Sequence, residues 1–174
     1  MRRFHGAILT LVGVVLLGAA PAETKVELKG VHLCCPACVK AVGEILKKVD
    51  GVKGACDREK RTVTITAADA AAAQKALDAL AAGGFHGDSD NASVTIKDDS
   101  GVAKGKVKNL TVTGAHNCCG QCCKQIKATV AKVNGVTGDT AKPKLSTFEV
   151  TGDFDAAELV QALNAAGFHV KVSK

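Results

Sequence analysis

The spacing of apolar and polar residues predicts the same series of elements twice along the chain. Residues 25–29 alternate polar and apolar side chains, as a half-buried strand does, whereas apolar residues recur at helical spacing from Val39 to Val49. The first copy has predicted strands at 25–29, from 52 onward, at 61–66 and at 94–96, and helices from 36 and at 70–82. The second has strands at 107–112, 147–150 and 170–172, and helices at 121–133 and 155–165.

Short matching sequences show that the two copies are an internal repeat. Gly51-Val52 corresponds to Gly135-Val136, and Gly84-Phe85-His86 corresponds to Gly167-Phe168-His169. The order strand, helix, strand, strand, helix, strand is that of a ferredoxin-like sandwich. We therefore predict an α+β protein with one βαββαβ domain at 23–97, a polar linker at 98–105 and a second such domain at 106–174.

The amino terminus has the pattern of a secretory signal peptide. Arg2 and Arg3 precede an uncharged, mostly apolar run at 7–20, and Ala20-Pro21-Ala22 places small residues at a cleavage site. We expect a signal peptide at 1–22, with an uncleaved anchor as the alternative. The mature chain is then expected in a periplasm or outside the cell, without stable membrane insertion.

Composition argues against nucleic acid as a partner. The formal net charge is only +6, and the chain has no Tyr or Trp to alternate with a basic run. Valine, alanine, leucine and isoleucine must form the cores. The sequence also lacks paired carboxylates, a Ser-His arrangement or a phosphate loop at a spacing typical of catalysis, so we do not expect an enzyme.

Six of the eight cysteines lie in a motif that occurs twice, His-x-Cys-Cys-x-x-Cys, at 32–38 and at 116–122. Each motif falls between a predicted strand and a predicted helix. The amino terminus of a helix favours the thiolate form of a nearby cysteine, and thiolates bind soft metal ions. The motif is therefore a candidate site for a soft metal ion, a redox disulfide or a structural bridge.

The element order and the Cys-x-x-Cys at the start of the first helix resemble the heavy-metal-associated domain. That family includes copper chaperones, amino-terminal domains of copper-transporting ATPases and the periplasmic mercury-binding protein. The resemblance extends over nearly all of both repeats and implies a metal ligand pair in each, Cys35 with Cys38 and Cys119 with Cys122. This chain differs from the family pattern in the three residues before each pair, which are His32-Leu33-Cys34 in the first repeat and His116-Asn117-Cys118 in the second.

These departures leave the ligand set open. Possible additional ligands are Cys34, Cys118, His32 and His116, since three thiolates and one imidazole complete a tetrahedral zinc-type site. Two soft ions per chain are expected, with Cu(I) first and Zn(II) or Hg(II) as alternatives. The implied partners are the metal ion, and a metal transporter or another metal-binding protein.

The remaining cysteines and histidines are interpreted as structural. Cys123 aligns with Val39 and is expected to be a buried core residue, and Cys56 to be structural or idle. We expect His86 and His169 to face solvent. Two other functions stay open, namely thiol-disulfide exchange through the Cys-x-x-Cys pairs, and a disulfide-stapled structural or interaction module.

Overall fold

The structure, a computed structural model, describes residues 22–173. In the first half the elements are β1 (Thr24–Lys29), α1 (Pro36–Leu46), β2 (Val52–Asp57), β3 (Thr62–Ala67), α2 (Ala70–Ala82) and β4 (Asp88–Ser89). The second half has β5 (Lys106–Thr113), α3 (Gly120–Val130), β6 (Val136–Asp139), β7 (Phe148–Asp155), α4 (Ala156–Ala165) and β8 (Lys171–Ser173). The predicted signal peptide, apart from its last residue, lies outside the described residues. None of the helices in 22–173 has both the length and the apolar character that a membrane crossing requires.

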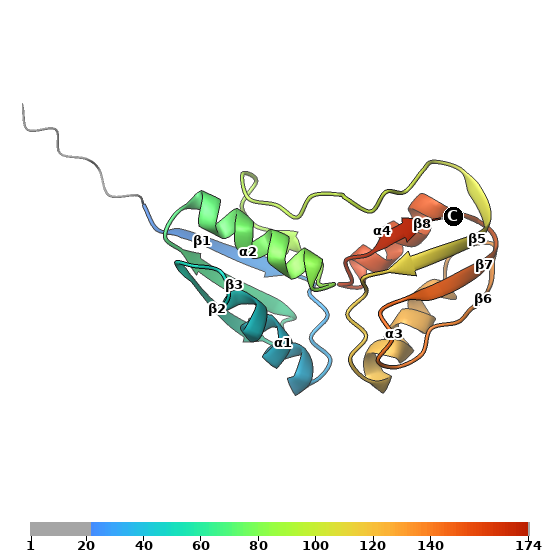
Figure 1. The fold of residues 1–174 in the computed structure, drawn as a ribbon, viewed down its shortest axis with the longest axis horizontal. Coiled ribbons are helices and arrows are strands. Elements are labelled where there is room, and N and C mark those ends of the chain that lie inside the picture. The colour runs from blue at the N-terminus through green and yellow to red at the C-terminus, as the bar shows by residue number, and fades with distance from the viewer. Residues whose placement is uncertain (1–21, 174) are drawn as a thin grey trace, which may run out of the picture.

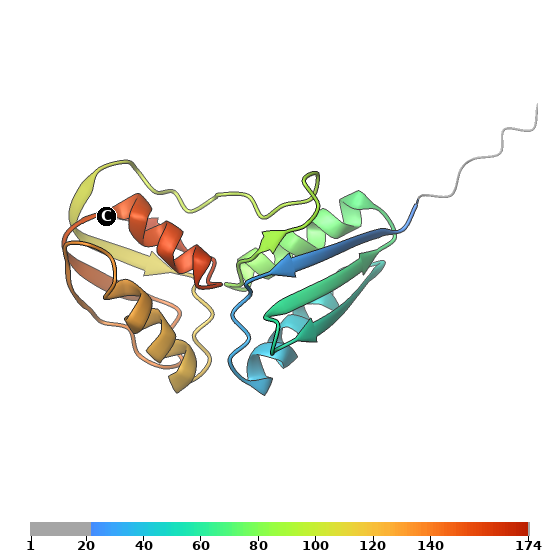
Figure 2. The same ribbon diagram turned by 180° about the vertical axis from the view of Figure 1, so that it is seen from behind.

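Each half forms its own four-stranded antiparallel sheet with two helices on one face (Figure 1). The strand orders are β2-β3-β1-β4 and β6-β7-β5-β8, which is the ferredoxin-like order in both cases. The predicted α+β fold with two such sandwiches is confirmed. Figure 2, turned by 180° about the vertical axis, resembles Figure 1 with the halves exchanged, so an approximate twofold axis relates them.

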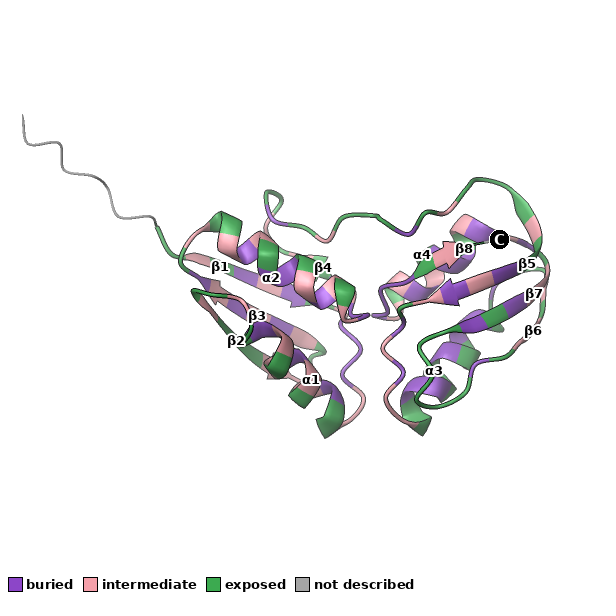
Figure 3. Cartoon of the chain, viewed as in Figure 1, coloured by how far each residue is buried: buried purple, intermediate pink, exposed green. Residues whose placement is uncertain are grey.

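The core of each half lies between its sheet and its helices (Figure 3). The alternation predicted at 25–29 places Val26 and Leu28 on this inner face, where they pair with Ile65 and Val63 of β3. All four side chains are fully buried, together with Leu77 of α2. Burying a side chain of this size stabilises a fold by about 1.5–3 kcal/mol.

The prediction of a strand at 94–96 is wrong. The place beside β1 is taken by β4, two residues long, which starts soon after α2. Val94 is still buried, but Thr95 exchanges its backbone hydrogen bonds with the side-chain amide of Gln74 on α2, at 2.8 and 3.2 Å. The apolar pattern therefore identified a buried segment correctly, but its backbone is satisfied by one side chain rather than by a neighbouring strand.

The two halves meet where α2 and α4 end (Figures 1 and 2). Phe85 and Phe168 form an antiparallel bridge between the halves, and both rings are fully buried. Two backbone hydrogen bonds flank it, from His86 N to the Gly167 carbonyl at 3.0 Å and from His169 N to the Gly84 carbonyl at 3.1 Å. The repeated Gly-Phe-His sequence thus forms a backbone contact between the repeats.

The prediction that His86 and His169 face solvent is wrong. His169 is 4% exposed and His86 is half-buried, because each follows the Phe that joins the halves. Their Nδ1 atoms are 3.2 Å apart, and His169 Nε2 lies 2.7 Å from a carboxylate oxygen of Asp99. If His169 donates its Nε2 proton to Asp99, its Nδ1 accepts the proton of His86 Nδ1, and this hydrogen bond joins the halves.

Candidate metal centre

Local structure brings the thiols of each motif to the start of a helix. Cys35 and Cys119 occupy the N-cap positions of α1 and α3, with extended backbones. Cys38 and Cys122 follow in the first helical turn and are fully buried. Side chains at this spacing share one side of a helix, so each Cys-x-x-Cys pair presents both sulfurs together, 3.6 Å apart in both halves.

The two motifs come together in one site rather than two. The connections that follow β1 and β5 run side by side in both views (Figures 1 and 2). The six-thiol cluster consists of Cys34, Cys35, Cys38, Cys118, Cys119 and Cys122, and each sulfur lies within 4.0 Å of at least one sulfur of the other half. The shortest of these distances, 3.5 Å, joins Cys34 of the first half to Cys122 of the second. All eight cysteines of the chain are free thiols.

Two imidazoles border the cluster, and each is held by the other half. The His32 ring stacks on Phe168 and the His116 ring stacks on Phe85, with centroids 4.2 Å apart in both pairs. Among residues 22–173, neither buried Nε2 atom has a hydrogen-bond partner. A buried nitrogen without a partner carries a desolvation cost, so both atoms are available to a ligand.

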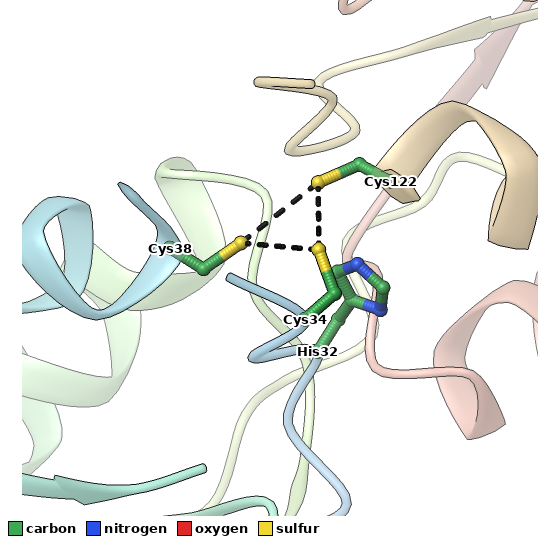
Figure 4. A group of neighbouring side chains, drawn as sticks. All are labelled: His32, Cys34, Cys38 and Cys122. Carbon is green, nitrogen blue, oxygen red and sulfur yellow. Dashed lines mark hydrogen bonds between the residues drawn. The ribbon is translucent and has the colours of Figure 1, made fainter. Parts of the chain in front are cut away.

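Potential ligand atoms fall into three groups whose members lie within 4.8 Å of one another. The groups are His32 with Cys34, Cys38 and Cys122; His116 with Cys38, Cys118 and Cys122; and Cys34 with Cys35 and Cys119. Figure 4 shows the first group, in which Cys38 from α1 and Cys122 from α3 point toward each other beside Cys34. Every group contains residues of both halves. The arrangement therefore places all eight residues that the sequence marks as ligands or possible ligands around one centre.

The sequence predicted that a helix amino terminus would favour the thiolate form of a nearby cysteine. In the structure, the local environment lowers the pKa of one cluster cysteine and raises the pKa of others. The backbone N–H of Cys122 lowers the pKa of the Cys119 thiol to about 7. Burial raises the pKa of Cys34, and raises that of Cys118 to about 12. The hydrogen bond with Cys122, followed by burial, raises the pKa of Cys38. Without a cation, most of the cluster is thus held in the neutral thiol form.

The same burial keeps His32 neutral. Burial first, then the guanidinium of Arg61, lowers the pKa of His32 to about 4. A neutral imidazole is the form that binds a metal ion. Sequence reasoning did not identify Arg61, which donates to the carbonyl of Ala166 in the other half at 3.1 Å. It also did not identify that the Phe168 and Phe85 rings stack on His32 and His116 across the two halves, although the repeated Gly-Phe-His sequence was the available signal.

The two cysteines outside the motifs lie apart from the cluster. Cys123 is 4% exposed in the core of the second half, with its sulfur 3.5 Å from the carbonyl of Ala141, as predicted for a small buried residue. Cys56 lies half-buried on β2. Neither belongs to a group that could hold a metal ion within the described part of the chain.

Comparison with known proteins gives only distant similarity. No protein-family model and no curated protein matches the chain. The chain is similar to the solution structure of the N-terminal soluble domains of Bacillus subtilis CopA, with 17% identity, 88% of this chain and 95% of that chain covered, and a TM-score of 0.32. It is also similar to the water-soluble region of the P-type ATPase CopA from Bacillus subtilis, with 19% identity, coverage of 88% and 93%, and a TM-score of 0.32.

Proposed function

We propose that the chain is an exported carrier or sequestering protein for thiophilic metal ions, of the heavy-metal-associated type, and that it is not an enzyme. The observation that carries the proposal is the six-thiol cluster, in which every sulfur lies within 4.0 Å of a sulfur from the other half. A fold gains little by gathering six thiols at one place, because a thiol is a weak hydrogen-bonding group. A soft cation supplies the missing stabilisation.

The choice of ion follows from the donor atoms. Thiolates bind Cu(I), Zn(II) and similar ions in preference to hard cations. The resemblance to the heavy-metal-associated domain favours Cu(I), and Zn(II) and Hg(II) suit the same sulfurs. Metal transporters or other metal-binding proteins are the proposed partners, since Cys35 and Cys119 are half-exposed and accessible to an incoming thiol.

Thiol-disulfide exchange is the second candidate, and one observation favours it. The pKa of Cys119, lowered to about 7, suits an attacking thiolate. Cys122, the other member of that pair, is fully buried and its pKa is raised. We therefore propose metal binding as the main function.

The test is the metal content of residues 23–174, purified reduced and without oxygen. The chain is loaded with Cu(I), Zn(II) or Hg(II) against a competing chelator, and bound metal is measured by mass spectrometry. We expect metal bound by the wild type and by a Cys123→Val control, and none by a variant in which all six cluster cysteines are serine. A wild-type chain that binds none of the three ions, or that reduces insulin at the rate of an oxidoreductase, would refute the proposal.

A further inference from the structure

Two of the candidate ligand groups are related by the approximate twofold axis and share their central thiols. The first ligand set is His32, Cys34, Cys38 and Cys122, and the second ligand set is His116, Cys118, Cys122 and Cys38. Each half thus contributes three ligands to its own set and one to the other. The shared sulfurs, Cys38 Sγ and Cys122 Sγ, are 3.8 Å apart and are the two fully buried thiols of the cluster (Figure 4).

We propose that the cluster binds two divalent thiophilic ions, of which Zn(II) is the type, as one dinuclear centre bridged by the thiolates of Cys38 and Cys122. Each ion takes a third thiolate, Cys34 or Cys118, and one imidazole, His32 or His116. This inference rests on the proposed function and specifies the ion class and its number. It differs from the arrangement expected from the sequence, in which each Cys-x-x-Cys pair holds its own ion.

The sulfur positions in each ligand set match the size of a tetrahedral thiolate site. Tetrahedral ligands with zinc–sulfur bonds of about 2.3 Å are separated by about 3.8 Å. The sulfurs of the first set are 3.7, 3.8 and 3.5 Å apart. Those of the second set are 3.8, 3.6 and 3.8 Å apart. Both triangles already have the size that a tetrahedral thiolate site requires, and they have one edge in common.

The imidazoles complete the two sites. Each ring is held in place by a Phe of the opposite half and has a buried Nε2 atom without a partner among the described residues. His32 itself is 5% exposed. Three thiolates with one imidazole is a frequent structural zinc site, so the donors match the ion as well as the distances do.

Charge balance favours divalent over monovalent ions. Cys34, Cys38, Cys118 and Cys122 together release four protons on binding and become four thiolates. Two divalent ions neutralise these four charges, whereas two Cu(I) ions would leave two negative charges at buried sulfurs. Because an uncompensated buried charge is costly, the neutral centre is the more stable.

Cys35 and Cys119 belong to neither set and provide the internal control. They lie 3.8 Å apart at the two helix N-caps, and both are half-exposed. In a dinuclear centre they are dispensable for stoichiometry, and we assign them the capture of incoming ions. In the one-ion-per-loop arrangement they are instead essential ligands.

Zinc titration of the reduced 23–174 chain against a chromophoric chelator separates these cases. We expect two Zn(II) per chain in the wild type and in the double variant Cys35→Ser with Cys119→Ser. Cys38→Ser alone should weaken the binding of both Zn(II) ions at least tenfold, since each ion loses a ligand. The inference is overturned if Cys38→Ser keeps one ion at wild-type affinity, if the double variant loses an ion, or if the chain takes up Cu(I) but not Zn(II). No binding of any of the three soft ions overturns the proposed function itself.

Cobalt substitution tests the bridge without any variant. Two Co(II) ions that share thiolates are magnetically coupled, so the wild-type chain loaded with two Co(II) should show a moment per ion below that of the chain loaded with one. Equal moments per ion at both loadings would mean that the ions are not bridged.

Discussion

Substitution of Gly167 by alanine should separate the two halves without touching a thiol. Gly167 follows Ala166, the C-cap residue of α4, and has φ +92°. A Cβ at Gly167 would overlap the backbone nitrogen of His32 and lie 2.6 Å from the Gly30 carbonyl oxygen. The obstructing atoms are backbone atoms of the opposite half, so no rotation of a side chain relieves the overlap. The halves must move apart at the bridge between Phe85 and Phe168.

The expected cost has two parts. A left-handed backbone conformation costs alanine about 1–2 kcal/mol relative to glycine. Separation at the bridge also breaks the hydrogen bonds from His86 N to Gly167 and from His169 N to Gly84, each of which contributes about 1 kcal/mol. The second part, about 2 kcal/mol, acts on the contact between the halves and corresponds to about a 30-fold shift toward the open form.

Gly30 provides the matched control, because it has φ +78° and a Cβ there would have no heavy atom within 4 Å. Gly30→Ala should carry the conformational cost alone. We expect Gly167→Ala to bind Zn(II) about 30-fold more weakly than Gly30→Ala and to give a larger radius of gyration by small-angle scattering. Equal zinc affinity and equal size in the two variants would show that the closed contact does not assemble the site.

Two further predictions concern protonation. Burial, followed by the charge of His169, lowers the pKa of His86, against the opposing effect of Asp88 and Asp98. A histidine with a lowered folded-state pKa stabilises the fold above its unfolded pKa of about 6.5, and this contribution is lost as the pH falls below that value. Apo wild type should therefore lose more stability than His86→Gln between pH 7 and pH 5 in urea unfolding, and parallel losses would contradict this. At pH 7, iodoacetamide should label Cys119 first in the reduced apo chain, because its pKa is about 7, while Cys118, whose pKa is raised to about 12, and the buried Cys123 react slowly. Peptide mass spectrometry would contradict this assignment if Cys118 were labelled first.

The fold was largely predictable because its signals are local. The alternation at 25–29 and the helical spacing before Gly51 each depend on one element burying one face, and the order of elements within each repeat indicated the ferredoxin-like sheet. The strand at 94–96 was mispredicted because a buried residue such as Val94 looks the same whether its backbone bonds to a strand or to the side chain of Gln74. Apolar pattern reports burial, and does not report the hydrogen-bond partner.

The ligand candidates could be predicted from the motif, but their common centre could not. Spacing within a motif fixes which sulfurs share a helix start, so Cys35 and Cys38 could be paired from the sequence. The 3.5 Å distance between Cys34 and Cys122 depends on how the two halves dock, and residues far apart in the chain decide that. The same docking buries His169, which looked like a solvent-facing residue when each repeat was considered alone.

The connection between β4 and β5 changes how the shared site depends on protein concentration. Two separate copies of a half would have to meet by diffusion, and their thiols would join only in a concentrated solution. Joined in one chain, the halves experience an effective concentration that is in the millimolar range for short flexible tethers. The backbone carbonyl of Ser100 in this connection also accepts a hydrogen bond from the backbone N–H of Val172 in β8 at 2.8 Å, which further limits how far the two halves can move apart. The two halves therefore dock within a single molecule. Even in a very dilute solution, one chain keeps both ligand sets close enough together to bind the two proposed metal ions.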